Sequence, residues 1–248
     1  MKKEEAIQVA VRCRPLSQRE LDTRDDLCVN LRGKNTVVIC DSAATSSTSR
    51  KEFTFDKVFW SLSEDHPSYA TQKDVFDGFG ASIVDSAIEG YNACIFAYGQ
   101  TGSGKSYSMV GSDTDAEHKG LLPRLLERLF AGIGHQHQQE EEKSGTSACC
   151  KATVDVSMME IYNESVYDLL DPQMLQNTNG RHKSQSLKVR IHPKTGAYVE
   201  KLKLLGAASI TEALRLVELG SKARTIHATN MNATSSRAHT VFTIHLCQ

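Results

Sequence analysis

The stretch GQTGSGKS, from Gly99 to Ser106, decides how the rest of this sequence is interpreted. It matches the pattern Gly-x-x-x-x-Gly-Lys-Ser of a phosphate-binding loop at every required position. The apolar run ACIFAY (residues 93–98) precedes it and predicts a central strand covered on both faces, and a helix-compatible stretch follows it. We therefore predict a phosphate-binding loop. The alternative is a glycine-rich turn with a solvent-exposed lysine.

The residue types of this loop suit a nucleoside triphosphate with Mg²⁺. Glycines let backbone N–H groups turn inward around phosphates, Lys105 can neutralise the β- and γ-phosphate oxygens, and Ser106 can offer its hydroxyl to Mg²⁺. The residues expected to contact nucleotide in the loop are Gly99, Gln100, Thr101, Gly102, Ser103, Gly104, Lys105 and Ser106.

Composition narrows the class of protein. The 248 residues suffice for one large domain, and a formal net charge of −1 gives no global basic field for nucleic acid. Seven scattered cysteines form no CxxC pair, and no signal peptide or membrane-length apolar run is present. We expect a soluble intracellular protein that binds neither nucleic acid nor membrane through this domain.

Hydrophobic periodicity predicts strands and helices that intermix along the chain. Strands are expected at residues 7–11, 154–158 and 240–246, helices at 72–89, 122–133, 165–170 and from Ser209 to Gly220, and an exposed loop at 134–147. Gly90 and Gly220 are expected to end helices, and Ser209 with Glu212 to form a capping box. This order predicts an α/β fold with a central mixed β-sheet flanked by helices on both faces, and the phosphate loop at the carboxyl end of strand 93–98.

A second polar loop, NMNATSSRAH (residues 230–239), holds hydroxyls, an amide and an arginine. Such groups can sense a γ-phosphate, complete a Mg²⁺ shell and orient a water molecule. Taken alone the loop also fits a solvated serine-rich turn.

Together, IFAYGQTGSGKSYSM and NATSSRAH resemble the phosphate loop and switch I of the kinesin motor domain, and VRCRP resembles that family's adenine-contacting segment. The supporting strings FTFDKVFW and EIYNESVYDLLDP follow in the family's order, and the ending Lys-Ser-Tyr is most similar to the kinesin-3 branch. The resemblance covers essentially the whole chain. It implies a cytoplasmic, cytoskeletal motor that hydrolyses Mg²⁺-ATP and moves along microtubules.

The resemblance also implies roles for individual residues. Arg12, Arg14 and Pro15 would flank the adenine, with Tyr107 stacking on it. In switch I, the residues with implied roles are Asn232 toward the γ-phosphate, Ser235 on the attacking water, Ser236 with Ser106 on Mg²⁺, and Arg237 toward an acidic residue of switch II.

Two departures from the family pattern matter. Ala238 stands where the family usually has serine, and no Asp-x-x-Gly motif of switch II follows His239. We therefore expect residues 1–248 to be the N-terminal part of one motor domain, with little microtubule-stimulated ATPase. One alternative is a catalytically silent nucleotide- or microtubule-binding module. The other is a small-molecule P-loop kinase, which the sequence disfavours because no arginine-rich lid is apparent.

A local excess of positive charge lies between residues 181 and 194 and suits the acidic surface of tubulin. The basic residues concerned are Arg181, Lys183, Lys188, Arg190 and Lys194. The alternative is an ordinary solvated hairpin.

Overall fold

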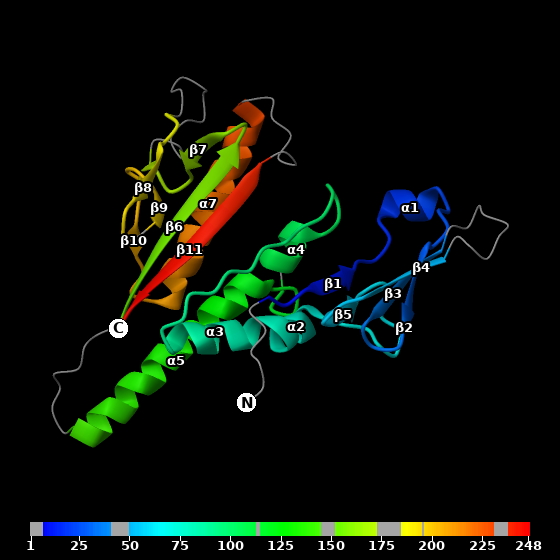
Figure 1. The fold of residues 1–248 in the computed structure, drawn as a ribbon, viewed down its shortest axis with the longest axis horizontal. Coiled ribbons are helices and arrows are strands. Elements are labelled where there is room, and N and C mark those ends of the chain that lie inside the picture. Colours follow the sequence, from blue (N-terminus) through cyan, green and yellow to red (C-terminus); the bar gives the residue numbers. More distant parts are fainter. Residues whose placement is uncertain are drawn as a thin grey trace. The chain divides into compact units, whose positions relative to one another are not determined.

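The computed structural model describes residues 7–40, 50–112, 115–144, 152–172, 185–194, 196–230 and 238–248, with only the helical backbone given for 135–144 and 226–230. Its contacts divide the chain into two compact units (Figure 1). The first comprises Met1–Asp85 and Ala93–Leu125, and the second Ser86–Asn92 and Leu126–Gln248. Each unit has its own buried apolar residues.

The first unit contains two separate sheets. Strand β1 (Ala10–Cys13) pairs in parallel with β5 (Lys57–Trp60), and β2 (Val29–Arg32), β3 (Thr36–Cys40) and β4 (Arg50–Thr54) form an antiparallel sheet. The strand predicted over residues 7–11 is thus confirmed in part, because β1 begins at Ala10. Short helix α1 (Gln18–Asp22) follows β1 and starts at a capping box between Ser17 and Glu20.

The helix predicted over residues 72–89 is confirmed, with one irregular turn inside it. Helix α2 (Gln72–Val75) passes into a π-helical turn η2 (Phe76–Gly80) and then into α3 (Ala81–Ile88). Gly90 follows with φ +92°, a left-handed conformation that suits a helix-ending glycine. The apolar cluster around this helix consists of Phe59, Ala70, Val75, Phe76 and Leu121.

The second unit is organised around the long strand β6 (Thr153–Tyr162). This strand lies between β10 (Leu205–Gly206) and β11 (His239–Cys247), and β7 (Ser165–Asp168) also pairs with it, all antiparallel. Helix α7 (Ile210–Asn230) packs on β6, as Figure 1 shows. A hairpin of β8 (Val189–His192) and β9 (Gly196–Val199) is separate from this sheet.

The strand predicted at residues 93–98 is wrong for this structure. The segment has no strand conformation, and Phe96 and Tyr98 are 82% and 95% exposed. A strand exists through its ladder of backbone hydrogen bonds, and no such bond joins this segment to another strand among the described residues. Ile95 is the residue of this run that packs against the apolar cluster.

Three other local predictions are corrected. The loop expected at 134–147 is helical as far as Ser144, because α5 (Leu121–Ser144) continues through a run of Gln, Glu and Lys, which are good helix formers. Helix α7 passes through Gly220 to Asn230. The helix expected at 165–170 is strand β7, because its backbone completes a ladder with β6. The cap of α7 is confirmed where Ser209 Oγ accepts from Glu212 N at 3.2 Å.

Candidate nucleotide-binding site

The loop between Gly99 and helix α4 (Lys105–Met109) has the backbone that its glycines predict. Gly102 and Gly104 adopt φ +80° and +89°, left-handed values that side chains other than glycine rarely allow. Gly104 is the residue immediately before α4, so the turn into the helix depends on this conformation. Gly99 is constrained by space, because a Cβ there would lie 2.4 Å from Ser103 Oγ.

Lys105 folds back over the loop. Its Nζ donates to the carbonyl oxygens of Gly99 and Gln100, both at 2.7 Å. Ser106 is exposed in the first turn of α4. The buried Ser103 Oγ has no hydrogen-bond partner among the described residues. A cation at the loop, an exposed hydroxyl beside it and an unpaired hydroxyl within it are groups that fit a phosphate with its Mg²⁺.

Arg12 joins the end of β1 to the neighbouring helices. Its Nε donates to Ser61 Oγ at 3.0 Å, and its Nη1 donates to Gln72 Oε1 at 2.6 Å and to Ser108 Oγ at 3.1 Å. The guanidinium carbon lies 5.3 Å from the centre of the Tyr107 ring, which is a cation–π arrangement. Burial lowers the pKa of Arg12 from its usual value, because the charged form loses solvation.

Tyr107 lies partly exposed on α4, with 40% of its surface accessible. Its hydroxyl is 2.8 Å from Nδ1 of His118, a residue of the segment between α4 and α5. The hydroxyl of Tyr107 is therefore held by His118, and one face of its ring is in contact with Arg12. The structure brings Arg12 and Tyr107 into direct contact, whereas the prediction placed the base between them, so in this structure the pair forms a single stacking surface.

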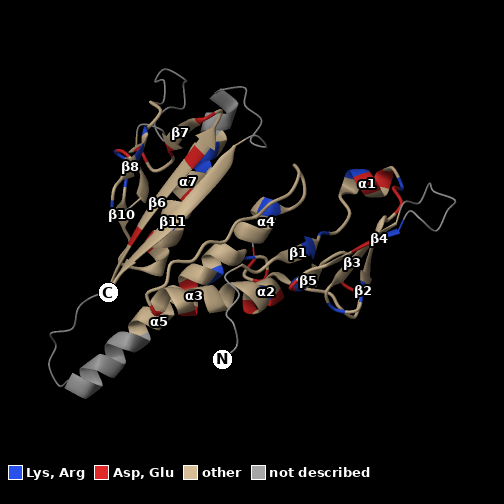
Figure 2. Cartoon of the chain, in the orientation of Figure 1, with Lys and Arg blue, Asp and Glu red and all other residues tan. Residues whose placement is uncertain are grey.

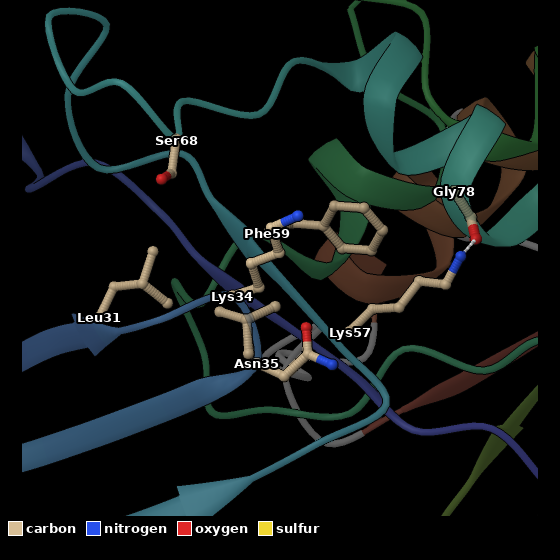
Figure 3. A pocket seen from close by; sticks show the side chains of 8 residues that line it. Leu31, Lys34, Asn35, Lys57, Phe59, Ser68 and Gly78 are labelled. Atoms are coloured by element: carbon tan, nitrogen blue, oxygen red, sulfur yellow. Dashed lines mark hydrogen bonds between the residues drawn. The ribbon is translucent and has the colours of Figure 1, made fainter.

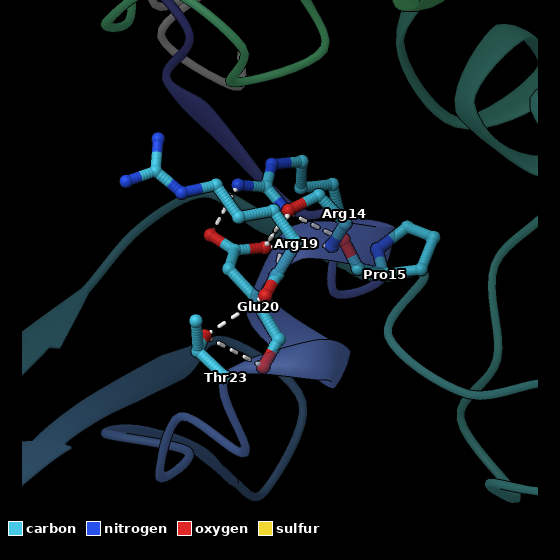
Figure 4. Close-up of polar contacts among 6 residues, drawn as sticks. Arg14, Pro15, Arg19, Glu20 and Thr23 are labelled. Carbon is cyan, nitrogen blue, oxygen red and sulfur yellow. Dashed lines mark hydrogen bonds and ion pairs between the residues drawn. The ribbon is translucent and has the colours of Figure 1, made fainter.

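Arg14 is paired with Glu20 of α1 (Figure 4). Its two terminal nitrogens donate to the two carboxylate oxygens, each at 2.8 Å, and Nη1 also donates to the carbonyl of Pro15 at 2.7 Å. The hydrogen bonds from Arg14 hold the pKa of Glu20 well below its usual range. A Cβ on Gly104 would lie 4.0 Å from the Cβ of Arg14, so Arg14 stands beside the loop.

Several residues of this site carry no signal in the sequence. Ser61, Gln72 and His118 contact the predicted residues, yet none of the three belongs to a spaced motif, whereas Ser108 lies in the string IFAYGQTGSGKSYSM and Glu20 in the capping box with Ser17. The predicted switch I residues Asn232, Ser235, Ser236 and Arg237 lie outside the described residues. Only their neighbour Ala238 is described, immediately before β11.

The expected basic surface is described in part. Lys188, Arg190 and Lys194 are exposed on or beside the β8–β9 hairpin, whereas Arg181 and Lys183 lie outside the described residues. Arg190 Nε pairs with Glu200 Oε2 at 3.0 Å, so part of the positive charge is compensated locally. Figure 2 shows both signs of charge in this part of the chain.

A further hollow of about 350 Å³ opens near β5 and η2 (Figure 3). Its lining comprises Leu31, Lys34, Asn35, Lys57, Val58, Phe59, Ser68 and Gly78. The Lys57 ammonium donates to the Gly78 carbonyl across it. None of these residues belongs to the glycine-rich loop, so this hollow is distinct from the candidate nucleotide site.

Within the described part of the chain, no cluster of three or more His, Cys, Asp or Glu side chains is arranged to hold a metal ion. The hydroxyl of Ser106 is a different kind of ligand and suits a Mg²⁺ that is shared with phosphate. No helix in the described ranges is long and apolar enough to cross a membrane.

Residues 12–248 match the kinesin motor domain family. The chain belongs to this family. Relatives from the kinesin-3 branch include kinesin-like protein unc-104 of Caenorhabditis elegans, 42% identical over 98% of this chain and 14% of the relative. Kinesin-like protein KIF13A of Mus musculus is 45% identical over 98% of this chain and 13% of the relative. The chain thus spans about a seventh of the length of these relatives.

Solved structures confirm the predicted α/β fold. A KIF14 dimer with AMP-PNP in a two-heads-bound state on a microtubule has a TM-score of 0.81 and 39% identity, over 97% of this chain and 60% of that one. The structure of a fast kinesin has a TM-score of 0.79 and 34% identity, over 97% and 59% of the two chains. The resemblance inferred from the glycine-rich loop is therefore confirmed by the fold as well as by the sequence.

Proposed function

We propose that this chain binds Mg²⁺-ATP at Gly99–Ser106 and belongs to a motor that couples ATP hydrolysis to movement along microtubules. The observation that carries the proposal is the family match over residues 12–248. The phosphate loop supports it independently, because left-handed glycines, a buried unpaired hydroxyl and a lysine held by neutral carbonyls are gathered there. A kinesin solved with AMP-PNP on a microtubule is among the similar structures.

Each part of the loop has a role in this proposal. Lys105 exchanges its two carbonyl acceptors for phosphate oxygens, which is favourable because a charged donor binds an anionic acceptor more strongly than a neutral one. Arg12 and Tyr107 hold the adenine, with Arg14 and Pro15 at its edge. Phosphoryl transfer depends mainly on positioning and charge neutralisation, and these residues supply both.

The remaining catalytic roles fall to residues assigned by the family resemblance. We assign Asn232 to the γ-phosphate, Ser235 to the attacking water and Arg237 to a switch contact. Ser106 and Ser236 would hold Mg²⁺, which supplies neutralisation of the phosphate charge when it is bound.

The microtubule contact is assigned to the hairpin region. Lys188, Arg190 and Lys194 are exposed, and Val189 and Ile191 between them are 57% and 83% exposed. Basic side chains steer the approach to an acidic partner, and exposed apolar groups add area that is buried on binding. Together with Arg181 and Lys183 this region is the proposed tubulin-facing surface, which places the protein on cytoplasmic microtubules.

The test is steady-state ATP turnover measured with and without microtubules, beside a direct measurement of ATP binding. Stimulated turnover that is lost in Lys105→Ala supports the motor. ATP binding without turnover fits both the low stimulated ATPase expected of residues 1–248 alone and a catalytically silent nucleotide-binding module, the alternative to a motor. Absence of ATP binding by the folded protein contradicts the assignment of the loop.

A further inference from the structure

Gln72, the first residue of α2, is a buried polar side chain with every hydrogen-bonding group in use. It is 3% exposed. Its Oε1 accepts from Arg12 Nη1 at 2.6 Å, and its Nε2 donates to the carbonyls of Tyr107 at 2.7 Å and His118 at 3.2 Å. A buried amide that binds three segments distant in sequence fixes their relative positions, since each lost bond would leave a polar group unpaired.

The orientation of this amide is dictated by its neighbours. A guanidinium can only donate hydrogen bonds, and the two backbone carbonyls can only accept them. Turning the amide over would place its NH₂ group against the guanidinium of Arg12 and its oxygen against both carbonyl oxygens, and all three hydrogen bonds would be lost. Gln72 therefore has one favourable orientation, and that orientation sets the position of the Arg12 guanidinium relative to α4.

The Arg12–Tyr107 pair depends on this amide more than on the other contacts of Arg12. The remaining acceptors are the hydroxyls of Ser61 and Ser108, which lie at longer distances of 3.0 and 3.1 Å. Gln72 binds both members of the pair, the side chain of Arg12 and the backbone of Tyr107. It thus determines the spacing between the cation and the ring.

We infer that Gln72 is a positioning residue for base specificity, which holds Arg12 against the face of Tyr107 so that the pair forms one rigid wall on which a flat adenine stacks. The inference rests on the proposed function, because it takes these two residues together as one wall of the base pocket. Lys105 and the glycine-rich loop hold the phosphates, which ATP and GTP share. Loosening the Arg12–Tyr107 pair should therefore change the preference between bases more than it changes triphosphate binding.

The experiment measures the dissociation constants of Mg-ATP and Mg-GTP by calorimetry for wild type and Gln72 variants. In Gln72→Met, which keeps the length but has no hydrogen-bonding amide, we expect the ratio of ATP to GTP affinity to fall about tenfold, as loss of a bond to a charged group predicts. Gln72→Glu keeps an acceptor for Arg12 but places a carboxylate oxygen against the carbonyls of Tyr107 and His118, so it too should lose part of the preference. Gln18→Met, on the exposed face of α1, is the matched control and should leave the ratio unchanged.

The outcomes separate a positioning role from a merely structural one. A purely structural Gln72 would lower the melting temperature and leave the affinity ratio of the folded fraction unchanged, and this result overturns the inference. If Gln72→Met does not fold, Gln72→Asn decides the matter, because it keeps an amide but shortens its reach by one methylene. Wild-type protein that binds ATP and GTP equally also overturns the inference while phosphate binding stands. Wild-type protein that binds neither overturns the proposed function itself.

Discussion

Replacing Lys105 by methionine tests the nucleotide site most directly. Methionine keeps an unbranched apolar stem of similar length but has no charge and donates no hydrogen bond. In the structure the ammonium is held by two neutral carbonyl acceptors, each at 2.7 Å. The substitution therefore removes the cation at the loop and leaves the glycine backbone that forms it.

The size of the effect follows from the exchange of acceptors. Two hydrogen bonds from the Lys105 ammonium to phosphate oxygens would stabilise the ATP complex by about 6 kcal/mol. The two hydrogen bonds to carbonyls that are given up stabilise the free protein by about 3 kcal/mol. The difference of about 3 kcal/mol corresponds to roughly a hundredfold loss in ATP affinity. The fold itself should lose at most the same amount of about 3 kcal/mol, because the side chain is only half-buried and the freed carbonyls can reach water.

Calorimetric titration with Mg-ATP measures this loss, and circular dichroism checks that the variant folds. Lys34→Met is the matched control, since Lys34 is exposed and lines the separate hollow of Figure 3. We expect its ATP affinity to equal that of wild type. An ATP affinity of Lys105→Met within threefold of wild type would refute the reasoning, as would a larger loss in Lys34→Met than in Lys105→Met.

The remaining predictions concern backbone, charge and packing. Gly104→Ala should lower the free energy of unfolding by about 1–2 kcal/mol and weaken ATP binding, because alanine is strained at φ +89°. Gly134 has open space around it and ordinary helical backbone, so Gly134→Ala should raise the free energy of unfolding by up to about 1 kcal/mol, measured by thermal unfolding. The pKa of Glu20 is lowered in the folded protein, so the Glu20 carboxylate stabilises the fold fully above its ordinary pKa of 4.5, and this contribution is lost progressively as the pH falls below 4.5. The free energies of unfolding measured at pH 7 and pH 3 should therefore differ less in Glu20→Gln than in wild type. Gly220→Ala should destabilise by about 1–2 kcal/mol, since its Cβ would lie 2.1 Å from Met158 Sδ, and a double-mutant cycle with Met158→Ala should show that the two costs are not additive.

The features that the sequence predicted correctly are those set by local spacing. The glycine-rich loop is recognised because its glycines must adopt left-handed backbone wherever the rest of the chain lies. The long strands at 153–162 and 239–247 and the helix beginning at Gln72 follow periodicities that their own residues determine. The family resemblance predicted that Arg12 and Tyr107 contact the adenine, but their direct cation–π contact was not predicted.

The features that were missed depend on partners far away in the sequence. Gly220 was predicted to end a helix, yet it lies inside α7 because only glycine allows the close approach of Met158 on β6. Residues 165–168 are extended because β6 offers a ladder to them, and residues 93–98 lack such a ladder among the described residues. Gln72 has no local signature, since its three partners are 35, 46 and 60 residues away.

The partners of the three cations near the loop explain which of them can take a phosphate. Arg14 is already neutralised by the carboxylate of Glu20, so binding an anion would require that ion pair to share its charge. Arg12 is held by an amide and two hydroxyls and lies against one face of Tyr107, so the pair offers a flat surface to a base and little to a phosphate. Among the described residues Lys105 is held by two neutral carbonyls, which a dianionic phosphate displaces with a net gain because it offers a charged acceptor. These partners support the proposal that Lys105 binds the phosphate and Arg12 contacts the base, while the ion pair of Arg14 with Glu20 ties α1 to the segment beside the loop.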